Sequence, residues 1–329
     1  MTPSSKQLLV TGGSGFLGSK IVDLALDAGW KVRTLDRDSR TRDARVEMCV
    51  GDIADCAILH QACEGVSAVV HAAGLAHVFG PRSRDLAAFC AVNETGTRNV
   101  VDAALEADVA HVVLISSVSV YGPHDAAVCD ETAPCRPEGP YAVSKWRGEL
   151  AASERIAKSG AALTILRMAT IYGEGDRGNV AKLIAALDRG RFLWPGSGQN
   201  HKSLIYRDDA ARACLCALEA PAAGIGIFNV SVPAVTMREI VTAICQGLER
   251  PVPRLGIPQS FLLAASAIAG ALGDPGQLRQ RFQKFIRDDV YSGSRFETAY
   301  GFHPAVSLAE GMRREVNFMR SQSLRGSSE

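Results

Sequence analysis

A tyrosine and a lysine stand four residues apart in the segment Tyr141-Ala-Val-Ser-Lys145. On a helix, this spacing puts the two side chains on one face. A free phenol has a pKa of about 10, which is too high for an efficient base at neutral pH. A neighbouring ammonium favours the phenolate and lowers that pKa. The pair therefore predicts a base that takes a proton from a substrate hydroxyl, although Tyr-x-x-x-Lys also occurs by chance.

A hydroxyl that could work with this pair follows the apolar run at 111–116. This run ends in SSVSVYG, which begins at Ser116. Ligands of parallel sheets bind in the crevice at the carboxyl ends of the strands. We therefore predict that Ser117 orients the substrate hydroxyl or shares its proton. Ser116 and Ser119 are equally well explained as residues that end a strand.

Three glycines follow another apolar run near the N-terminus. The sequence LLVTGGSGFLG places Gly12, Gly15 and Gly18 between an expected strand and an expected helix. Glycine lets the backbone turn tightly and approach a pyrophosphate, and the helix N-terminus offers free N–H groups and a positive dipole end. The turn predicts a dinucleotide site that includes Phe16 and Leu17. The alternative is a plain strand-to-helix turn.

A carboxylate ends the next expected strand, at Asp36. There it would accept hydrogen bonds from an adenosine ribose and repel a 2′-phosphate, which favours NAD over NADP. Arg37 weighs against this choice, because a guanidinium binds phosphate well. Other arginines lie nearby and are also explained as a solvated surface run: Arg33, Arg40, Arg42 and Arg45. We predict NAD, with its cationic nicotinamide ring lowering the pKa of Tyr141 and its ribose held by Lys145.

The first half of the chain alternates short apolar runs with amphipathic helix patterns. The runs are continuous and rich in β-branched residues, as in strands buried on both faces. Strands are expected at 7–11, 31–36, 47–51, 68–71, 111–116 and 163–168. Helix patterns lie between them, for example at 15–28 and 93–106. This alternation predicts an α/β protein with a Rossmann, doubly wound parallel sheet.

The pattern changes near residue 170. Proline and glycine become frequent, and helical patterns dominate the apolar segments that follow. We therefore predict a Rossmann domain at 1–170 and a smaller, mainly helical substrate lobe at 171–329. The boundary leaves open that segments of the lobe cross back to the first domain.

Composition excludes several other classes of protein. A net charge of +1 over 329 residues does not indicate a protein that binds nucleic acid through an overall positive charge. The segment 261–272 is almost purely apolar but too short to span a membrane. A buried helix is the favoured interpretation of this segment, and a membrane-surface contact is the alternative.

The cysteines and the N-terminus bear on the compartment. Nine cysteines without paired spacings indicate free thiols in a reducing compartment rather than a disulfide framework or a metal site. The N-terminus lacks the design of a signal peptide. We predict a cytoplasmic protein without a bound metal.

Taken together, these motifs resemble the extended short-chain dehydrogenase/reductases of the NAD-dependent epimerase/dehydratase family. The motifs occur in the order TGGSGFLG, the Asp36 strand end, GDI, HAAG, VNETGTRN, SSVSVYG and YAVSK. The resemblance spans nearly the whole chain. It implies that NAD also contacts Asp52, Ile53, Ala72, Ala73 and Gly74. Asn93 would support the strand that carries the active site.

Later motifs resemble the nucleotide-sugar branch of this family, in particular UDP-sugar 4-epimerases. These motifs are RMATIYGEGD and KSLIYRDDAA. The resemblance implies that Asn179, Val180 and Lys202 contact the diphosphate and that Arg287 closes the site. Lysine binds phosphate as a point charge, without the bidentate fork of arginine. The alternative for Lys202 is an ordinary surface lysine.

Two departures from the family narrow the function. Dehydratases and decarboxylases of the family carry a carboxylate just after the catalytic hydroxyl, where this chain has Val118 and Ser119. The acid that an elimination needs is therefore missing. Ala76 replaces a lysine of well-known epimerases and Met168 replaces a frequent proline, which loosens the match to any one epimerase.

The leading hypothesis is epimerisation at C4 of a UDP-hexose or UDP-N-acetylhexosamine through a transient 4-keto intermediate. A nucleotide-sugar 4-keto reductase would use the same three residues. A hydroxysteroid or lipid-alcohol dehydrogenase would use the apolar segment 261–272 as a pocket wall, and a non-catalytic binding protein is a further alternative. Family resemblance also implies a homodimer, formed through helices at 93–106 and 141–157.

Overall fold

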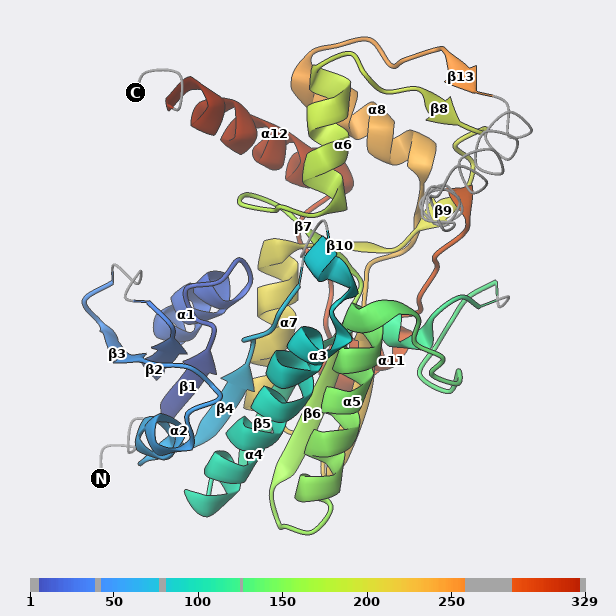
Figure 1. The fold of residues 1–329 in the computed structure, drawn as a ribbon. Coiled ribbons are helices and arrows are strands. Elements are labelled where there is room, and N and C mark those ends of the chain that lie inside the picture. The colour runs from blue at the N-terminus through green and yellow to red at the C-terminus, as the bar shows by residue number, and fades with distance from the viewer. Residues whose placement is uncertain (1–5, 39–42, 77–80, 125–126, 258–285, 326–329) are drawn as a thin grey trace.

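The computed structural model describes residues 6–38, 43–76, 81–124, 127–257 and 286–325 (Figure 1). The apolar segment 261–272, Arg40 and Arg42 lie outside these ranges. Seven strands pair in parallel to form the central sheet. In spatial order they are β11 (Ile225–Val230), β6 (Ala162–Met168), β5 (His111–Ser117), β4 (Ala68–His71), β1 (Gln7–Thr11), β2 (Lys31–Asp36) and β3 (Val46–Val50).

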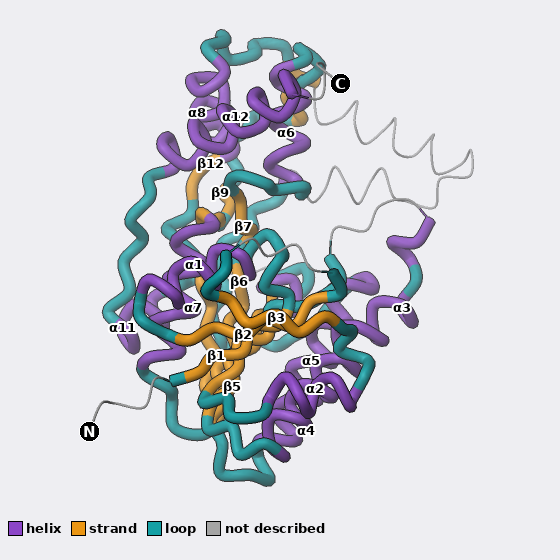
Figure 2. Tube along the Cα trace, turned by 90° about the vertical axis from the view of Figure 1, so that its left-hand side faces the viewer, coloured by secondary structure: helices purple, strands orange, loops and turns teal. Residues whose placement is uncertain are grey.

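Helices cover both faces of this sheet, because successive residues of a strand point to opposite sides. Leu8 and Val10 join a core with α1 and α7, whereas Leu9 joins a core with α2, α4 and α5. The two sets of helices lie on opposite sides of the sheet (Figures 1 and 2). Their bounds are α1 (Gly18–Asp27), α7 (Arg207–Glu219), α2 (Cys56–Cys63), α4 (Thr97–Glu106) and α5 (Gly139–Ile156). The doubly wound Rossmann sheet is confirmed.

The sequence patterns locate the first six strands to within one residue. The predictions at 7–11, 31–36 and 68–71 match the observed bounds, those at 111–116 and 163–168 differ by one residue at one end, and that at 47–51 is shifted by one residue. The predicted helix at 15–28 begins only at Gly18, because the glycine turn precedes it. The predicted helix at 93–106 divides into a π-helical turn, Ala91–Gly96, and α4. A short α3 (Leu86–Cys90) precedes that turn.

The C-terminal part is mainly helical, as predicted. Three helices enclose a third apolar core at one end of the molecule (Figure 1), namely α6 (Asn179–Asp188), α8 (Met237–Leu248) and α12 (Leu308–Arg325). Thr236 begins α8, since its side chain accepts from the Glu239 N–H while the Glu239 carboxylate accepts from the Thr236 N–H. Short strands pair here as β10 (Leu204–Tyr206) with β7 (Thr170–Tyr172), β12 (Val235–Thr236) with β9 (His201–Lys202), and β13 (Gly256–Ile257) with β8 (Trp194–Pro195).

Part of the chain beyond residue 170 returns to the central sheet. β11 extends the sheet beside β6, and Phe228 of β11 packs against α11 (Ser294–Tyr300). Helix α7 covers one sheet face. No strand was predicted at 225–230, so the sheet is one strand wider than the sequence pattern indicated.

The structure also bears on the cysteines and on membrane-spanning helices. All nine cysteines lie in the described residues and none forms a disulfide. Among the helices of the described ranges, none combines the length and the apolar character needed to cross a membrane.

Candidate active site

The glycine turn has a backbone that other residues would disturb. Gly12 has a φ of +72°, and a Cβ there would lie 2.8 Å from the Ala73 backbone. A Cβ on Gly18 would overlap the Gly12 carbonyl oxygen. Gly15 donates its N–H to that same oxygen at 3.0 Å. The turn thus brings the start of α1 against the chain segment that follows β4.

The start of α1 suits an anionic group. Leu17, the N-cap residue, provides no side-chain hydrogen bond, and the first turn of the helix contains no acidic residue. The N–H groups of Ser19 and Lys20 already donate to Gly15 and Leu17, so what the helix offers to a pyrophosphate is mainly its positive dipole end. Leu17 itself is buried in the core, and Phe16 lies beneath the Arg207 guanidinium, 5.7 Å from the ring centroid.

Asp36 offers an unpaired acceptor at the end of β2. Its Oδ1 accepts from the backbone N–H and the hydroxyl of Ser14, at 3.0 and 2.8 Å. Its Oδ2 is buried and has no hydrogen-bond partner within the described chain. A buried carboxylate oxygen without a donor is costly, and two ribose hydroxyls supply such donors. Asp36 therefore fits the adenosine ribose of NAD.

The arginines around Asp36 divide into separate roles. Arg33 donates to the carbonyl oxygens of Ala62 and Glu64, both at 2.8 Å, and Arg45 pairs with Asp43. Arg37 is exposed at the residue after Asp36. The side chains of Arg33 and Arg45 thus serve local structure, which weakens the case for a 2′-phosphate site.

The other predicted cofactor residues surround the same edge of the sheet. Asp52 is exposed and Ile53 is buried, just after β3, and the Asn99 amide donates to the Ile53 carbonyl at 3.1 Å. Ala72 and Ala73 donate their N–H groups to the backbone oxygen and the hydroxyl of Thr11. A Cβ on Gly74 would lie 3.6 Å from Lys145 Nζ. The loop after β4 therefore lies between the glycine turn and the catalytic helix α5.

The structure brings Ser117, Tyr141 and Lys145 together at the carboxyl edge of β5. The Ser117 hydroxyl lies close enough to the Tyr141 phenol to lower the pKa of that phenol. Lys145 donates from Nζ to the Ile115 carbonyl at 2.6 Å. Phe89 of α3 packs its edge against the Tyr141 ring, with the centroids 6.3 Å apart.

Burial is the largest influence on the pKa values of the Tyr141 phenol and the Lys145 ammonium. It raises the pKa of Tyr141 above its ordinary value, and the nearby Ser117 hydroxyl opposes it. The expectation that Lys145 lowers the pKa of Tyr141 is wrong for the protein's own groups, because burial outweighs every charge nearby. Burial also lowers the pKa of Lys145 to about 8, and the Glu149 carboxylate opposes that effect.

Asn93 braces the loop after β4 against α5. Its Oδ1 accepts from the Leu75 N–H at 2.8 Å, and its Nδ2 donates to the Leu75 carbonyl at 3.0 Å and to the Ser144 hydroxyl at 2.9 Å. The residue is 2 % exposed. We therefore interpret Asn93 as a support for α5 and the cofactor loop rather than as a direct cofactor contact.

A buried ion pair that the motifs did not reveal lies behind the catalytic residues. Arg167 Nη2 of β6 lies 2.7 Å from Glu149 Oε2 of α5, and both side chains are almost fully buried. The Ser116 hydroxyl donates to Glu149, and Arg167 donates to the Tyr121 hydroxyl at 2.9 Å. Glu149 could have been found in the sequence, because it lies one helical turn after Lys145.

Lys202, predicted at the diphosphate, and Arg287, predicted to close the site, meet around Asp289. Lys202 Nζ donates to the Arg287 carbonyl at 2.8 Å and to the Asp289 carboxylate at 2.6 Å. Arg287 donates to the other oxygen of Asp289 at 3.0 Å, and its Nε is buried without a partner in the described chain. With a side chain only 14 % exposed, Lys202 does not resemble an ordinary surface lysine.

Asn179 and Val180 form the first turn of α6. Asn179 is exposed, whereas the Val180 side chain is buried in the third core. The Asp176 carboxylate accepts from the N–H groups of Gly178 and Ala181 and so occupies this helix N-terminus. A diphosphate contact here remains a prediction that rests on the Asn179 side chain and the backbone.

The structure also shows what surrounds positions 118 and 119 and whether possible metal ligands gather. Val118 is buried beside Tyr121, Cys129 and Tyr291, and Ser119 is partly buried, so this turn presents no carboxylate. Within the described ranges, no three histidine, cysteine or acidic side chains gather as a metal site would require.

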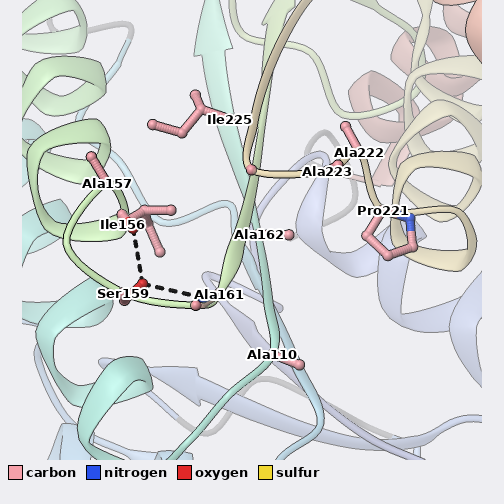
Figure 3. A pocket seen from close by; sticks show the side chains of 12 residues that line it. Ala110, Ile156, Ala157, Ser159, Ala161, Ala162, Pro221, Ala222, Ala223 and Ile225 are labelled. Atoms are coloured by element: carbon pink, nitrogen blue, oxygen red, sulfur yellow. Dashed lines mark hydrogen bonds between the residues drawn. The ribbon is translucent and has the colours of Figure 1, made fainter.

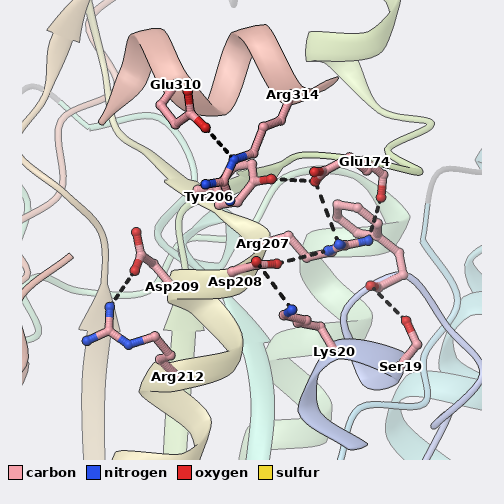
Figure 4. A network of polar contacts seen from close by, with 11 residues as sticks. Ser19, Lys20, Glu174, Tyr206, Arg207, Asp208, Asp209, Arg212, Glu310 and Arg314 are labelled. Carbon is pink, nitrogen blue, oxygen red and sulfur yellow. Dashed lines mark hydrogen bonds and ion pairs between the residues drawn. The ribbon is translucent and has the colours of Figure 1, made fainter. Parts of the chain in front are cut away.

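A polar cluster joins the glycine turn to the C-terminal helices (Figure 4). Arg207, at the start of α7, donates to the Glu174 carbonyl at 2.6 Å, and Glu174 also pairs with Tyr206. Lys20 of α1 lies 3.4 Å from Asp208. None of these contacts was predicted from the sequence, because they join residues far apart in the chain.

A separate hollow of about 520 Å³ lies at the other edge of the sheet (Figure 3). It is lined by Ile156 and Ile225 and by mostly small residues at 157, 159–162 and 221–224, together with Ala110. These segments adjoin the amino ends of β5, β6 and β11, opposite to Ser117. We therefore do not assign this hollow to the reaction.

Comparison with known proteins places this geometry in a family. Residues 8–231 match the model of the "NAD dependent epimerase/dehydratase family". An N-acetyl-alpha-D-glucosaminyl-diphospho-ditrans,octacis-undecaprenol 4-epimerase of Escherichia coli O157:H7 is 29% identical, over 94% of both chains. A UDP-glucose 4-epimerase of Mycolicibacterium smegmatis is 30% identical, over 96% of this chain and 99% of that protein.

Solved structures agree with this placement. MoeE5 in complex with UDP-glucuronic acid and NAD superposes with a TM-score of 0.77 at 26% identity, over 96% of this chain and 99% of that chain. The match includes both the sheet and the C-terminal part. The chain therefore belongs to the NAD dependent epimerase/dehydratase family and is an NAD-dependent enzyme of the extended short-chain dehydrogenase/reductase type.

Proposed function

We propose that this protein is an NAD-dependent epimerase that inverts C4 of a UDP-hexose or UDP-N-acetylhexosamine. The observation that carries the proposal is the placement of Ser117 near Tyr141 and beside Lys145, at an edge that has no carboxylate at 118 or 119. These groups suit the removal and return of a hydroxyl proton, and no acid for elimination follows Ser117.

The residues divide the work as follows. Ser117 would hold the C4 hydroxyl and Tyr141 would take its proton, the proton transfer that the formation of a 4-keto sugar requires. Lys145 would hold the nicotinamide ribose, while the cationic nicotinamide and Ser117 would favour the phenolate. After the 4-keto sugar has turned over, Tyr141 would return the proton to the C4 oxygen, and return of the hydride to the other face of C4 would give the epimer. The cofactor supplies hydride transfer in both directions.

The diphosphate of the substrate would bind at Lys202 and Arg287. Both cations can supply donors to an anion, although the carboxylates of Asp288 and Asp289 offset their charge. The unpaired Nε of Arg287 is a donor that a phosphate oxygen would satisfy.

A lipid-linked sugar diphosphate is a second candidate substrate. The E. coli relative acts, by its name, on an undecaprenol-linked N-acetylglucosaminyl diphosphate, and it matches this chain over 94% of both proteins. Both substrate types place a diphosphate next to the sugar, so Lys202 and Arg287 would serve either one.

We also propose a cytoplasmic homodimer that packs α4 and α5 of each subunit together. Leu150 of α5 supports this, because half of its surface is exposed although it is apolar. The nine unpaired cysteines support a reducing compartment. Light scattering of wild type and Leu150→Glu should show a dimer and a monomer, and a monomeric wild type would contradict the dimer.

The function is tested by incubating the NAD-containing protein with UDP-glucose, with UDP-N-acetylglucosamine and with a short-chain polyprenyl-diphosphate N-acetylglucosamine. We expect an equilibrium mixture of C4 epimers from one of these substrates, without net NADH formation. Tyr141→Phe is the control and should convert none of them while still binding NAD. Net accumulation of NADH would instead identify a dehydrogenase or a reductase, and a lipid-only reaction would select the second candidate.

A further inference from the structure

We propose that His71 and Thr97 are positioning residues that couple the cofactor turn to the catalytic tyrosine through one buried chain of hydrogen bonds. The proposal rests on the role of Tyr141 given above. The chain begins at Thr11, the last residue of β1, and ends at the backbone of Tyr141 in α5. His71 and Thr97 lie in the middle of this chain.

The contacts are continuous and short. The Thr11 hydroxyl lies 2.7 Å from His71 Nδ1, and His71 Nε2 lies 3.0 Å from the Thr97 hydroxyl. Thr97 donates to the Asn93 carbonyl at 2.7 Å. The Asn93 amide then donates to the Ser144 hydroxyl at 2.9 Å, and Ser144 donates to the Tyr141 carbonyl at 2.9 Å.

A carbonyl oxygen can only accept, so the carbonyls of Asn93 and Tyr141 determine the direction of the hydrogen bonds between them and Thr11. Thr97 uses its only proton on Asn93, so it must accept a proton from His71 Nε2. His71 is then the Nε2–H tautomer, and its Nδ1 accepts from Thr11. Thr97, His71 and Thr11 therefore each have one arrangement of donor and acceptor that satisfies these bonds. Loss of one hydroxyl leaves the two buried groups that it joined without their partner.

His71 stays neutral in this environment. It is 1 % exposed, and burial together with the nearby Lys145 ammonium lowers its pKa to about 3. The five side chains of the chain, from Thr11 to Ser144, are each at most 2 % exposed. Water therefore cannot replace a lost partner, and the chain does not change its protonation near neutral pH.

The chain connects three parts of the site that have to keep a fixed spacing. Thr11 leads into the glycine turn, Asn93 holds Leu75 of the cofactor loop, and Ser144 lies on the helix that carries Tyr141. Displacement of α5 would move Tyr141 away from the Ser117 hydroxyl, which opposes the effect of burial on the Tyr141 pKa. The charged groups near this helix face are Lys145 and, through it, Glu149.

A second buried histidine–threonine hydrogen bond in the sheet provides a matched control for the His71–Thr97 bond. His111 Nε2 lies 2.9 Å from the Thr164 hydroxyl, and both residues are buried. This pair lies near the amino ends of β5 and β6, at the edge opposite to Ser117. Thr164→Val therefore removes the same kind of bond without touching the site.

The experiment compares Thr97→Val, Thr97→Ser and Thr164→Val in the full-length, NAD-loaded protein. Tyr141 ionisation is read as the tyrosinate absorbance that Tyr141→Phe removes from each variant, a measurement that needs no substrate. We expect Thr97→Val to raise the Tyr141 pKa and to lower kcat roughly ten- to a hundredfold, with KM changed by less than about twofold. Thr97→Ser should restore the wild-type Tyr141 pKa and kcat, and Thr164→Val should change neither of these two quantities.

Equal losses of thermal stability in Thr97→Val and Thr164→Val, with Tyr141 ionisation unchanged in both, would overturn the proposal. If Thr97→Val does not fold, Ser144→Ala breaks the chain at its other end and should raise the Tyr141 pKa as well. An unshifted ionisation in Ser144→Ala would also overturn it. If every tested sugar is inert, only the proposed function fails, because the tyrosinate measurement still reports on the chain.

Discussion

At the scale of single residues, burial rather than charge sets the chemistry of the site. Tyr141 and Lys145 share a helix face, yet burial raises the pKa of the phenol and lowers that of the ammonium. Both shifts disfavour the charged forms, as expected in a low-dielectric environment. The bound cofactor and Ser117 are then the groups that favour the phenolate.

Asp36 should decide between NAD and NADP. Its unpaired Oδ2 accepts a charge-assisted hydrogen bond from the ribose, worth about 1.5–3 kcal/mol. Asp36→Ala should therefore weaken NAD binding at least about tenfold and narrow the preference over NADP. Titration calorimetry with both cofactors measures this. Equal affinity of the wild-type protein for NAD and NADP would contradict the assignment.

Lys145 should destabilise the fold at neutral pH. Its pKa is lowered from the ordinary value of 10.5 to about 8, so the buried charge costs stability below pH 8 and less as the pH rises toward 10.5. Lys145→Met should then be more stable than wild type by about 2 kcal/mol at pH 7, after loss of the bond to Ile115.

Chemical unfolding at several pH values tests this prediction. The gain should shrink between pH 8 and pH 10.5. Lys158→Met is the matched control, because Lys158 is exposed and pairs only with Glu154 one turn away. A gain of the same size at every pH would show that the lysine charge is not its source.

At the scale of elements, the Glu149–Arg167 pair joins α5 to the sheet. Arg167 lies on β6, Ser116 bonds to Glu149 from β5, and the Tyr121 hydroxyl donates to Asn229 of β11 at 2.7 Å. One helix is thus tied to three neighbouring strands. Because the ions are buried, each depends on its partner for compensation.

Removing both partners of this pair should cost less than the sum of the two single losses. Glu149→Met or Arg167→Met should each lower the free energy of unfolding by about 3–5 kcal/mol, and the double variant should lose less than the sum. Urea unfolding measures all three. Asp102→Ala, which breaks the half-exposed Arg155 pair between α4 and α5, should cost far less. Additive losses would contradict this account.

At the scale of the whole molecule, the sheet depends on chain from both halves of the sequence. β11 pairs with β6 along six residues, and α7 covers the face that contains Leu8 and Val10. The Rossmann domain predicted at 1–170 therefore lacks an edge strand and a covering helix that the folded chain provides from 207–230.

A fragment of residues 1–170 should accordingly not fold by itself. Without β11 and α7 it exposes buried strands and a large apolar surface. We expect a fragment ending at residue 170 to show no cooperative unfolding by circular dichroism, unlike the full chain. Cooperative unfolding with NAD binding in the fragment would support an independent domain.

Local spacing was enough to predict the elements that carry the chemistry. Tyr141 and Lys145 share a face because a helix repeats every 3.6 residues, and Asp36 ends a strand because its apolar run ends there. The glycine turn was recognisable for the same reason, since its strand and helix adjoin it in the chain. These features depend on neighbours a few residues away, and the structure places each of them as expected.

Only the tertiary structure decided the contacts between distant segments. Lys202 and Arg287 are 85 residues apart, and the hydrogen bonds from Thr11 to Tyr141 join five elements, β1, β4, the π-helical turn, α4 and α5. The width of the sheet, the buried Glu149–Arg167 pair and the direction of the Tyr141 pKa shift belong here as well. Each depends on which surfaces pack and how much water they exclude, and residue spacing along the chain does not encode that directly.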